Sequence, residues 1–167
     1  MAAHRYIEVN QLVKIYTTGK VKVSAVDHVN FYVDQGEFIG IMGASGSGKT
    51  TLLNILSTID TMSQGQVLYE GVDISRMGEE ELSDFRQKNL GFVFQDYNLL
   101  DTMTLQDNIA LPLALKGVSA AECIRRTEEY GRLFGLSAQL DKYPCQLSGG
   151  QKQKGAACRA LVTGPEI

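Results

Sequence analysis

The first third of the chain alternates apolar and polar residues in the way that β-strands do. Two runs rich in Val, Ile and Tyr, residues 7–16 and 21–34, lie on either side of Gly19 and predict two strands joined by a turn. A shorter apolar run, residues 38–42, predicts a strand that leads straight into a glycine-rich segment. Leucines and isoleucines at helical spacing follow this segment and end near Asp60. The predicted order is therefore strand, glycine loop, helix.

Beyond this point the pattern changes from strands to helices. Residues 66–70 and 91–94 predict two further short strands, and the charged run 79–88 predicts a helix between them. Helical spacing dominates residues 96–143, and a final helix is expected over residues 148–162. Two helix starts match the capping box, in which side chains satisfy the free amides of a first turn: Thr104 with Asp107, and Ser119 with Glu122.

Composition limits the protein class more than it indicates an activity. With 167 residues, 44% of them hydrophobic and 21% charged, the chain is expected to form one soluble domain with a real core. A net charge of −3 argues against a nucleic-acid partner, which favours a basic face. The cysteines are Cys123, Cys145 and Cys158, and their wide spacing fits reduced thiols. Because the sequence has no apolar run long enough to span a bilayer, any work at a membrane is expected to require docking onto a partner.

The glycine-rich segment, residues 43–50, reads Gly-Ala-Ser-Gly-Ser-Gly-Lys-Thr and matches the Walker A pattern GxxxxGK[ST]. Glycines let backbone N–H groups approach phosphate oxygens, and the N-terminus of the following helix attracts the same anion. Lys49 is expected to reach the β- and γ-phosphates, and the Thr50 hydroxyl to bind Mg²⁺. A plain glycine-rich turn is the alternative, and the loop alone fits kinases, GTPases and motor ATPases equally well. The predicted nucleotide-binding residues here are Gly43, Ala44, Ser45, Gly46, Ser47, Gly48, Lys49, Thr50 and Thr51.

A second motif narrows this choice, because residues 147–151 read Leu-Ser-Gly-Gly-Gln. With the Walker A loop about a hundred residues upstream, the sequence resembles the ABC transporter ATPases, whose signature peptide is LSGGQ. A serine cap and two glycines expose amides at a positive helix end. The resemblance implies that this peptide binds the γ-phosphate held by the partner subunit in a head-to-tail homodimer around two ATP molecules. The implied signature residues are Ser148, Gly149, Gly150 and Gln151.

Two further residues are assigned roles by the same resemblance, which covers essentially the whole chain. Gln95 occupies the Q-loop position, where the glutamine touches Mg²⁺ or the attacking water and relays the nucleotide state to the membrane subunit. Tyr16 occupies the place of the aromatic residue that stacks on adenine. The implied catalytic residues are thus Lys49 and Gln95, and the implied metal ligands are Thr50 and Gln95.

The implied fold is α/β, a P-loop NTPase (RecA-like) core with an N-terminal antiparallel β subdomain and an α-helical subdomain. A single ABC ATPase domain over residues 1–167 is expected, in which residues 1–36 form the β portion and residues 96–146 the helical subdomain. Residues 37–95 and 147–167 would form the P-loop core. The Walker B strand, the catalytic glutamate and the switch histidine of the family would follow residue 167, so the resemblance implies a C-terminally truncated chain that lacks the second half of the core.

Within the family, residues 91–102 look like the subgroup that includes peptide-antibiotic (bacitracin-type) resistance, lipoprotein-release and macrolide-export ATPases, and residues 56–60 and 109–115 favour the bacitracin type. The implied function is ATP hydrolysis that drives export or removal of a peptide, antibiotic or lipid-like substrate through a separate membrane permease. The protein would lie at the cytoplasmic face of the membrane, and the permease would contact residues 95–104. A nucleotide-binding module without turnover is the alternative. A chromosome-maintenance ATPase, which needs a long coiled coil between the motifs, and a small-molecule kinase fit less well.

The sequence departs from the family after the signature. Lys154 replaces an arginine and so loses a planar, five-donor group. Gly155 falls inside the predicted final helix, where glycine costs roughly 1 kcal/mol relative to alanine. Together the two residues are expected to loosen the signature helix.

Overall fold

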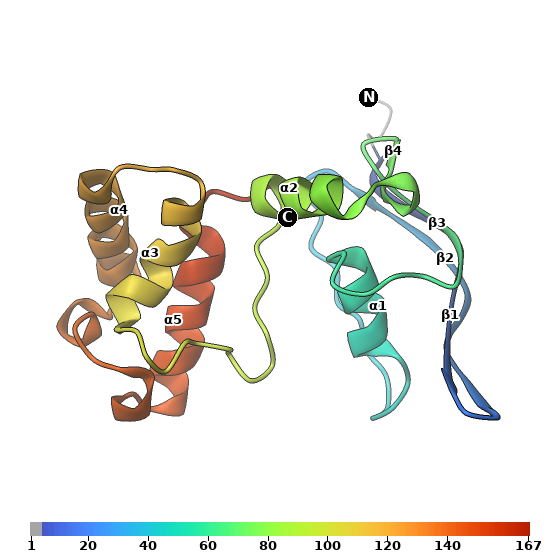
Figure 1. The fold of residues 1–167 in the computed structure, drawn as a ribbon, viewed down its shortest axis with the longest axis horizontal. Helices are drawn as coiled ribbons and strands as arrows, with labels where there is room; N and C mark the ends of the chain where they lie inside the picture. The colour runs from blue at the N-terminus through green and yellow to red at the C-terminus, as the bar shows by residue number, and fades with distance from the viewer. Residues whose placement is uncertain (1–4) are drawn as a thin grey trace. The chain divides into compact units, whose positions relative to one another are not determined.

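The computed structural model describes residues 5–167, and the chain divides into two compact units, residues 1–83 and residues 84–167. We call them the N-terminal unit and the C-terminal unit (Figure 1). The first four residues of the predicted β portion lie outside the described residues. The arrangement of the units as a single domain stays a prediction.

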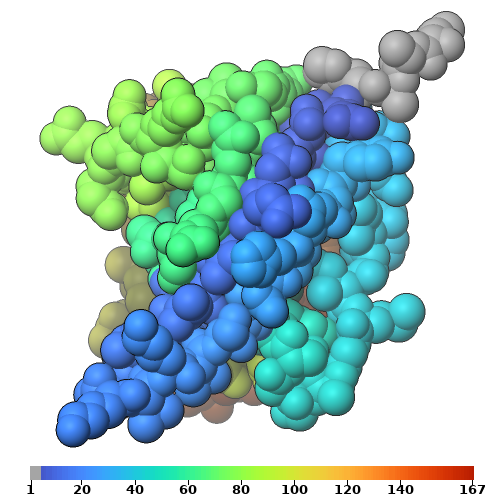
Figure 2. All heavy atoms as spheres, turned by 90° about the vertical axis from the view of Figure 1, so that its right-hand side faces the viewer, coloured from blue at the N-terminus to red at the C-terminus, as the bar shows by residue number. Residues whose placement is uncertain are grey.

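The N-terminal unit is built on an antiparallel sheet of four strands in the order β2-β1-β3-β4. Strands β1 (Arg5–Thr18) and β2 (Val21–Asp34) form a long hairpin, and Gly19 supplies the positive φ of +60° that the turn requires. Strand β3 (Gln64–Tyr69) pairs with the other edge of β1, and the short β4 (Val72–Asp73) pairs with β3. The hairpin runs diagonally across one face of this unit (Figure 2, blue). The predicted antiparallel β portion is confirmed.

Helix α1 (Lys49–Leu56) turns its apolar side inward, where Leu52 and Ile55 are buried. The Tyr69 hydroxyl of β3 donates a hydrogen bond to the Leu56 carbonyl and ties the end of the helix to the sheet. The remaining buried side chains of this core come mainly from the strands: Ile7, Val9, Leu12, Val13, Val26, Val67 and Ile74.

Helix α1 ends at Leu56, earlier than the end near Asp60 that the sequence pattern predicted. Thr58 has a φ of +58°, a left-handed conformation that stops an α-helix. The next two amides, of Ile59 and Asp60, both turn back to the Asn54 carbonyl at 2.8 and 3.1 Å. A left-handed terminus at a β-branched residue is unusual, so the apolar spacing alone gave no sign of it.

Two predicted strands, residues 38–42 and 91–94, are absent from the sheet, and both predictions are wrong for this structure. A strand needs a hydrogen-bonded neighbour, and among residues 5–167 no strand pairs with either segment. Phe38 and Met42 are accordingly 98% and 92% exposed. The Phe92 and Phe94 rings lie edge to face, with 4.6 Å between their centroids. This contact is possible because residues two apart lie on the same side of an extended backbone.

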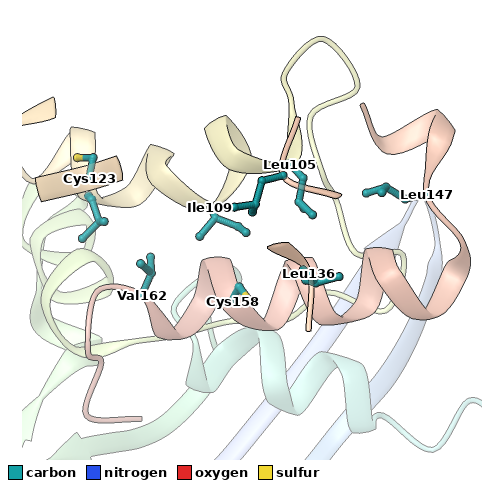
Figure 3. Packing of buried hydrophobic residues seen from close by; sticks show 9 residues of the cluster. Leu105, Ile109, Cys123, Leu136, Leu147, Cys158 and Val162 are labelled. Carbon is teal, nitrogen blue, oxygen red and sulfur yellow. The ribbon is translucent and has the colours of Figure 1, made fainter. Parts of the chain in front are cut away.

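The C-terminal unit is helical. Helix α2 (Glu79–Asn89) spans the point at which the two units divide, and α3 (Leu105–Leu115), α4 (Ala120–Leu133) and α5 (Gly149–Leu161) follow. Short 3₁₀ turns occur in this unit at Ser137–Gln139 and Pro144–Gln146, and another lies in the N-terminal unit at Ile74–Arg76. The core between α3, α4 and α5 is shown in Figure 3 and consists of Leu105, Ile109, Leu113, Cys123, Leu136, Leu140, Leu147, Cys158 and Val162.

The predicted helix starts are confirmed in different degrees. At α3 the capping box is complete, because the Thr104 hydroxyl accepts from the Asp107 amide and the Asp107 carboxylate accepts from the Thr104 amide. At α4 the Ser119 hydroxyl accepts from the Glu122 amide at 3.4 Å. The Glu122 carboxylate does not complete the box, because it accepts instead from Arg125 and Arg126 in the next turn. The capping pattern does not take such ion pairs into account.

Candidate nucleotide and signature sites

The glycine loop leads directly into helix α1, as the Walker A pattern predicts. Gly48 is the N-cap of α1 and has a φ of +87°. A Cβ atom at this position would lie 2.0 Å from the Ala25 carbonyl oxygen of β2, so no other residue fits here without moving the backbone. The first amides of α1 have no acceptor within the helix and stay available to an anion.

Lys49 folds back over the loop. Its ammonium group donates to the carbonyl oxygens of Gly43 at 2.9 Å and Ala44 at 2.6 Å, and to the Ser47 hydroxyl at 3.4 Å. The charge is thus held at the centre of the loop. The predicted loop residues Gly43, Ala44, Ser45, Gly46, Ser47 and Thr50 are exposed, whereas Gly48, Lys49 and Thr51 are half-buried.

An open groove of about 280 Å³ lies beside the loop within the N-terminal unit. One wall is β2, through Ser24 to Val29, and the other is formed by Ile41, Met42 and the residues around Lys49. No motif in the sequence points to the β2 wall, because its residues are the small and apolar ones of an ordinary strand. The register of the hairpin sets Tyr16 opposite Val23, the residue before Ser24.

Tyr16 lies on β1, 42% exposed, and is held from two sides. Its hydroxyl donates to the Asp60 carboxylate at 2.6 Å, and the Lys14 ammonium lies 4.9 Å from its ring centroid. Lys14 and Asp60 also form an ion pair at 2.6 Å. Burial raises the pKa of the Asp60 carboxyl, but hydrogen bonds from Lys14, Tyr16 and the Thr61 amide outweigh it and leave the pKa below its ordinary value. Neither Lys14 nor Asp60 was predicted as part of the site.

The signature peptide caps helix α5 in the C-terminal unit. The Ser148 hydroxyl accepts from the Gln151 amide at 3.3 Å, and the Gln151 side chain accepts from the Ser148 amide at 2.9 Å. This capping box leaves the amides of Gly149 and Gly150 at the positive end of the helix. Ser148 and both glycines are exposed, and a Cβ on either glycine would meet nothing within 4 Å. The peptide therefore presents donors on an open surface.

Gln95 is exposed at the tip of a tight turn in the C-terminal unit, closed by a 3.0 Å hydrogen bond from the Tyr97 amide to the Phe94 carbonyl. Tyr97 and Asn98, two and three residues after Gln95, both have left-handed φ values, +62° and +45°. Arg159 of the signature helix donates to their carbonyl oxygens at 2.8 and 2.6 Å. Sequence reasoning missed Arg159, because a charge inside an amphipathic helix usually faces solvent.

The loop beyond Asn98 is organised by one buried amide. Asn108 is 0% exposed; its Oδ1 accepts from the Leu100 amide at 2.7 Å. Its Nδ2 lies within hydrogen-bond distance of the carbonyl oxygens of Leu100, Met103 and Thr104. A polar residue at a core position of an apolar helix was the signal that could have identified it.

Helix α5 runs unbroken through the two departures after the signature, and the expected loosening stays a prediction. Gly155 is buried against α3, where a Cβ would lie 2.5 Å from Leu105 Cδ1. Lys154 donates to the Phe134 carbonyl at the end of α4, at 3.2 Å. The glycine thus permits close packing, and the lysine satisfies a helix terminus.

Among residues 5–167, no three His, Cys, Asp or Glu side chains gather as a metal site of their own. The oxygen of Thr50 and the amide oxygen of Gln95 suit Mg²⁺, a hard cation that commonly takes most of its ligands from phosphates and water. No helix within the described part of the chain is long and apolar enough to cross a membrane.

Comparison with known proteins shows the family. The model of the ABC transporter family matches residues 26–167, and the chain belongs to this family. Its fold is that of solved ABC cassettes, with a TM-score of 0.91 and 36% identity to the dimeric structure of MJ0796, over 95% of this chain and 70% of that one. A post-hydrolysis state of the same cassette, bound to ADP and Pi, gives the same values. The predicted fold class and family are confirmed.

Curated relatives agree at the sequence level. The chain is 44% identical over 161 residues to the bacitracin export ATP-binding protein BceA of Halalkalibacterium halodurans. It is 47% identical over 161 residues to an uncharacterized ABC transporter ATP-binding protein of Thermotoga maritima. These matches cover 96% of this chain, but 64% of the first relative and 69% of the second.

Proposed function

We propose that this protein is the ATP-binding subunit of an ABC transporter, which couples ATP binding and hydrolysis to export of a peptide antibiotic or lipid-like substrate through a separate membrane permease. The observation that carries the proposal is the presence in one chain of two helix starts suited to binding phosphate, at Gly48 before α1 and at Ser148 before α5. The similarity to a bacitracin export ATP-binding protein supports the substrate class.

In the proposed mechanism the triphosphate lies against the N-terminus of α1, and Lys49 exchanges its bonds to Gly43 and Ala44 for phosphate oxygens. Tyr16 stacks on the adenine, and the groove along β2 takes part of the nucleotide. Thr50 and Gln95 would hold the Mg²⁺ that accompanies ATP, and the ion would neutralise charge on the phosphates. Gln95 also orients the attacking water, and its turn passes the nucleotide state on to residues 95–104, which face the permease.

The signature residues Ser148, Gly149, Gly150 and Gln151 act on the γ-phosphate of a second copy in this proposal. Their donors lie on an open surface, as an interaction with another molecule requires. The functional unit is thus a homodimer around two ATP molecules, peripheral at the cytoplasmic face of the membrane.

Nucleotide binding is tested with a tryptophan probe, because the chain contains no tryptophan. In a Tyr16→Trp variant, Mg·ATP is expected to change the indole fluorescence saturably as adenine stacks on the ring. Adding Lys49→Ala should weaken binding by about 10- to 100-fold, the value of a charge-assisted hydrogen bond lost from the phosphates. The matched control is Tyr32→Trp, because Tyr32 is also an exposed tyrosine with a cation over its ring. The Arg5 guanidinium carbon lies 4.8 Å from the Tyr32 ring centroid.

A fluorescence change in Tyr32→Trp but not in Tyr16→Trp would contradict the placement of the base. Equal affinity with and without Lys49→Ala would contradict the phosphate loop. The transport part is tested in cells that express the protein with a bacitracin-type permease: bacitracin tolerance should depend on the protein and disappear with Lys49→Ala.

A further inference from the structure

Three side chains at the end of the β1–β2 hairpin form a closed network. Asp60 accepts from the Tyr16 hydroxyl through Oδ2 at 2.6 Å and from the Lys14 ammonium through Oδ1 at 2.6 Å. The same ammonium donates to the Thr61 carbonyl at 2.6 Å and lies over the Tyr16 ring. Lys14 is only 8% exposed, so its charge is largely removed from water and depends on these partners.

The network joins the tyrosine to the helix of the phosphate loop. The Asp60 amide donates to the Asn54 carbonyl of α1 at 3.1 Å, directly after the helix ends. On the other side, the Ser63 amide donates to the Val13 carbonyl of β1 at 2.8 Å, and the Ser63 hydroxyl accepts from the Ile15 amide at 2.9 Å and donates to the Ile15 carbonyl at 3.4 Å. Residues 60–63 therefore form a fixed bridge between α1 and the strand that carries Tyr16.

A base-stacking ring works best when its orientation is set before the ligand arrives. A free tyrosine on an exposed strand end rotates about two side-chain bonds, and stopping this rotation on binding lowers affinity. Here the hydroxyl is held by Asp60 and one ring face is covered by Lys14, so the other face is the one presented to a ligand.

We infer that Asp60, supported by Lys14, is a positioning residue that locks Tyr16 as the base platform and sets its distance from the phosphate loop. This inference rests on the proposed nucleotide site. Asp60 touches no ligand itself; it acts through the Tyr16 hydroxyl and through its backbone link to α1. The alternative is an ion pair that only stabilises the fold, and a ligand that lacks the base distinguishes the two.

The experiment compares Mg·ATP with magnesium tripolyphosphate, which has the phosphates but no adenine, in calorimetric titrations of the full chain. Asp60→Ala is expected to weaken ATP binding about 2- to 10-fold, because the freed Tyr16 side chain then loses conformational entropy when ATP binds. Tripolyphosphate binding should not change, since this ligand has no base to stack. Tyr16→Phe, which keeps the ring and loses the hydroxyl, should weaken ATP binding to a similar extent. The double variant should be no worse than either single variant, because both remove the same bond.

Two further variants complete the comparison. Asp60→Asn keeps an acceptor for the tyrosine hydroxyl and should recover most of the preference for ATP over tripolyphosphate. Asp141→Ala, at an exposed aspartate of the C-terminal unit, should behave like the unmutated chain.

Equal weakening of ATP and tripolyphosphate by Asp60→Ala would show a merely structural ion pair and overturn the inference. Additive losses in the double variant would overturn it as well. If the unmutated chain binds tripolyphosphate but does not prefer ATP, the base platform itself is wrong. If it binds neither ligand, the proposed nucleotide site fails, and that outcome is separate from failure of Asp60 alone.

Discussion

At the scale of single residues, Gly155 shows how one missing side chain decides helix packing. In a free helix, alanine is favoured over glycine by roughly 1 kcal/mol. In this protein the space for a methyl group is filled by the fully buried Leu105 of α3. Propensity and packing therefore oppose each other at this position, and the size of the steric conflict decides which one wins.

Gly155→Ala is expected to lower the free energy of unfolding by about 1 kcal/mol, because overpacking of about 1–3 kcal/mol exceeds the gain in propensity. Urea unfolding followed by circular dichroism measures the change. Gly150→Ala is the control on the same helix, where a Cβ meets nothing within 4 Å and a small gain in stability is expected. Adding Leu105→Val to Gly155→Ala should restore part of the loss. A Gly155→Ala variant more stable than the unmutated chain would contradict the steric argument.

At the scale of elements, the signature helix is connected to the turn that carries Gln95. Arg159 of α5 donates to two consecutive carbonyl oxygens that left-handed residues turn towards it. Such backbone conformations are costly for residues other than glycine and persist when the surroundings hold them. The contact makes the shape of the turn at residues 95–98 depend on α5.

Removing this contact should loosen the turn without unfolding the helical core. Arg159→Ala is expected to speed amide hydrogen exchange of Tyr97 and Asn98 by about 10- to 100-fold, which corresponds to loss of a charge-assisted hydrogen bond. Exchange of the buried Ile109 amide should not change. Arg132→Ala, at an exposed arginine of α4, is the matched control. Unchanged exchange at both turn amides would show that Arg159 does not hold the turn.

At the scale of the whole molecule, the proposed function requires two copies. Ser148 and Ser119 are both exposed serines that cap a helix by accepting from the amide three residues on, at 3.3 and 3.4 Å. Replacing either one by alanine removes the same kind of cap and costs about 1 kcal/mol of stability. The two variants therefore differ chiefly in whether they touch the signature.

Sedimentation velocity with a non-hydrolysable ATP analogue is expected to show a shift from monomer towards dimer. Ser148→Ala should weaken this association about 5- to 15-fold, the value of one hydrogen bond of about 1–1.5 kcal/mol to the γ-phosphate. Ser119→Ala should leave it unchanged. Equal effects of the two variants would mean that loss of a helix cap, and not loss of a γ-phosphate contact, is responsible.

Much of this protein can be predicted from the sequence because its signals are local. The β1–β2 hairpin follows from alternation and Gly19, and the capped starts of α3 and α5 follow from side chains that bond within four residues. The loop before α1 follows from glycines whose backbone only they adopt, as at Gly48. These features need no distant partner, so a pattern of neighbouring residues specifies them.

Only the tertiary structure decided the features that depend on contacts between distant residues. The apolar runs at 38–42 and 91–94 predict strands, yet a strand exists only beside another strand. The bond from Tyr16 to Asp60 spans 44 residues and that from Arg159 to Asn98 spans 61, and no local pattern encodes either partner. The sequence by itself thus determined the glycine loop before α1, the capped LSGGQ peptide and the family. The fold determined what orients Tyr16 and Gln95, because orientation comes from residues that meet only after folding.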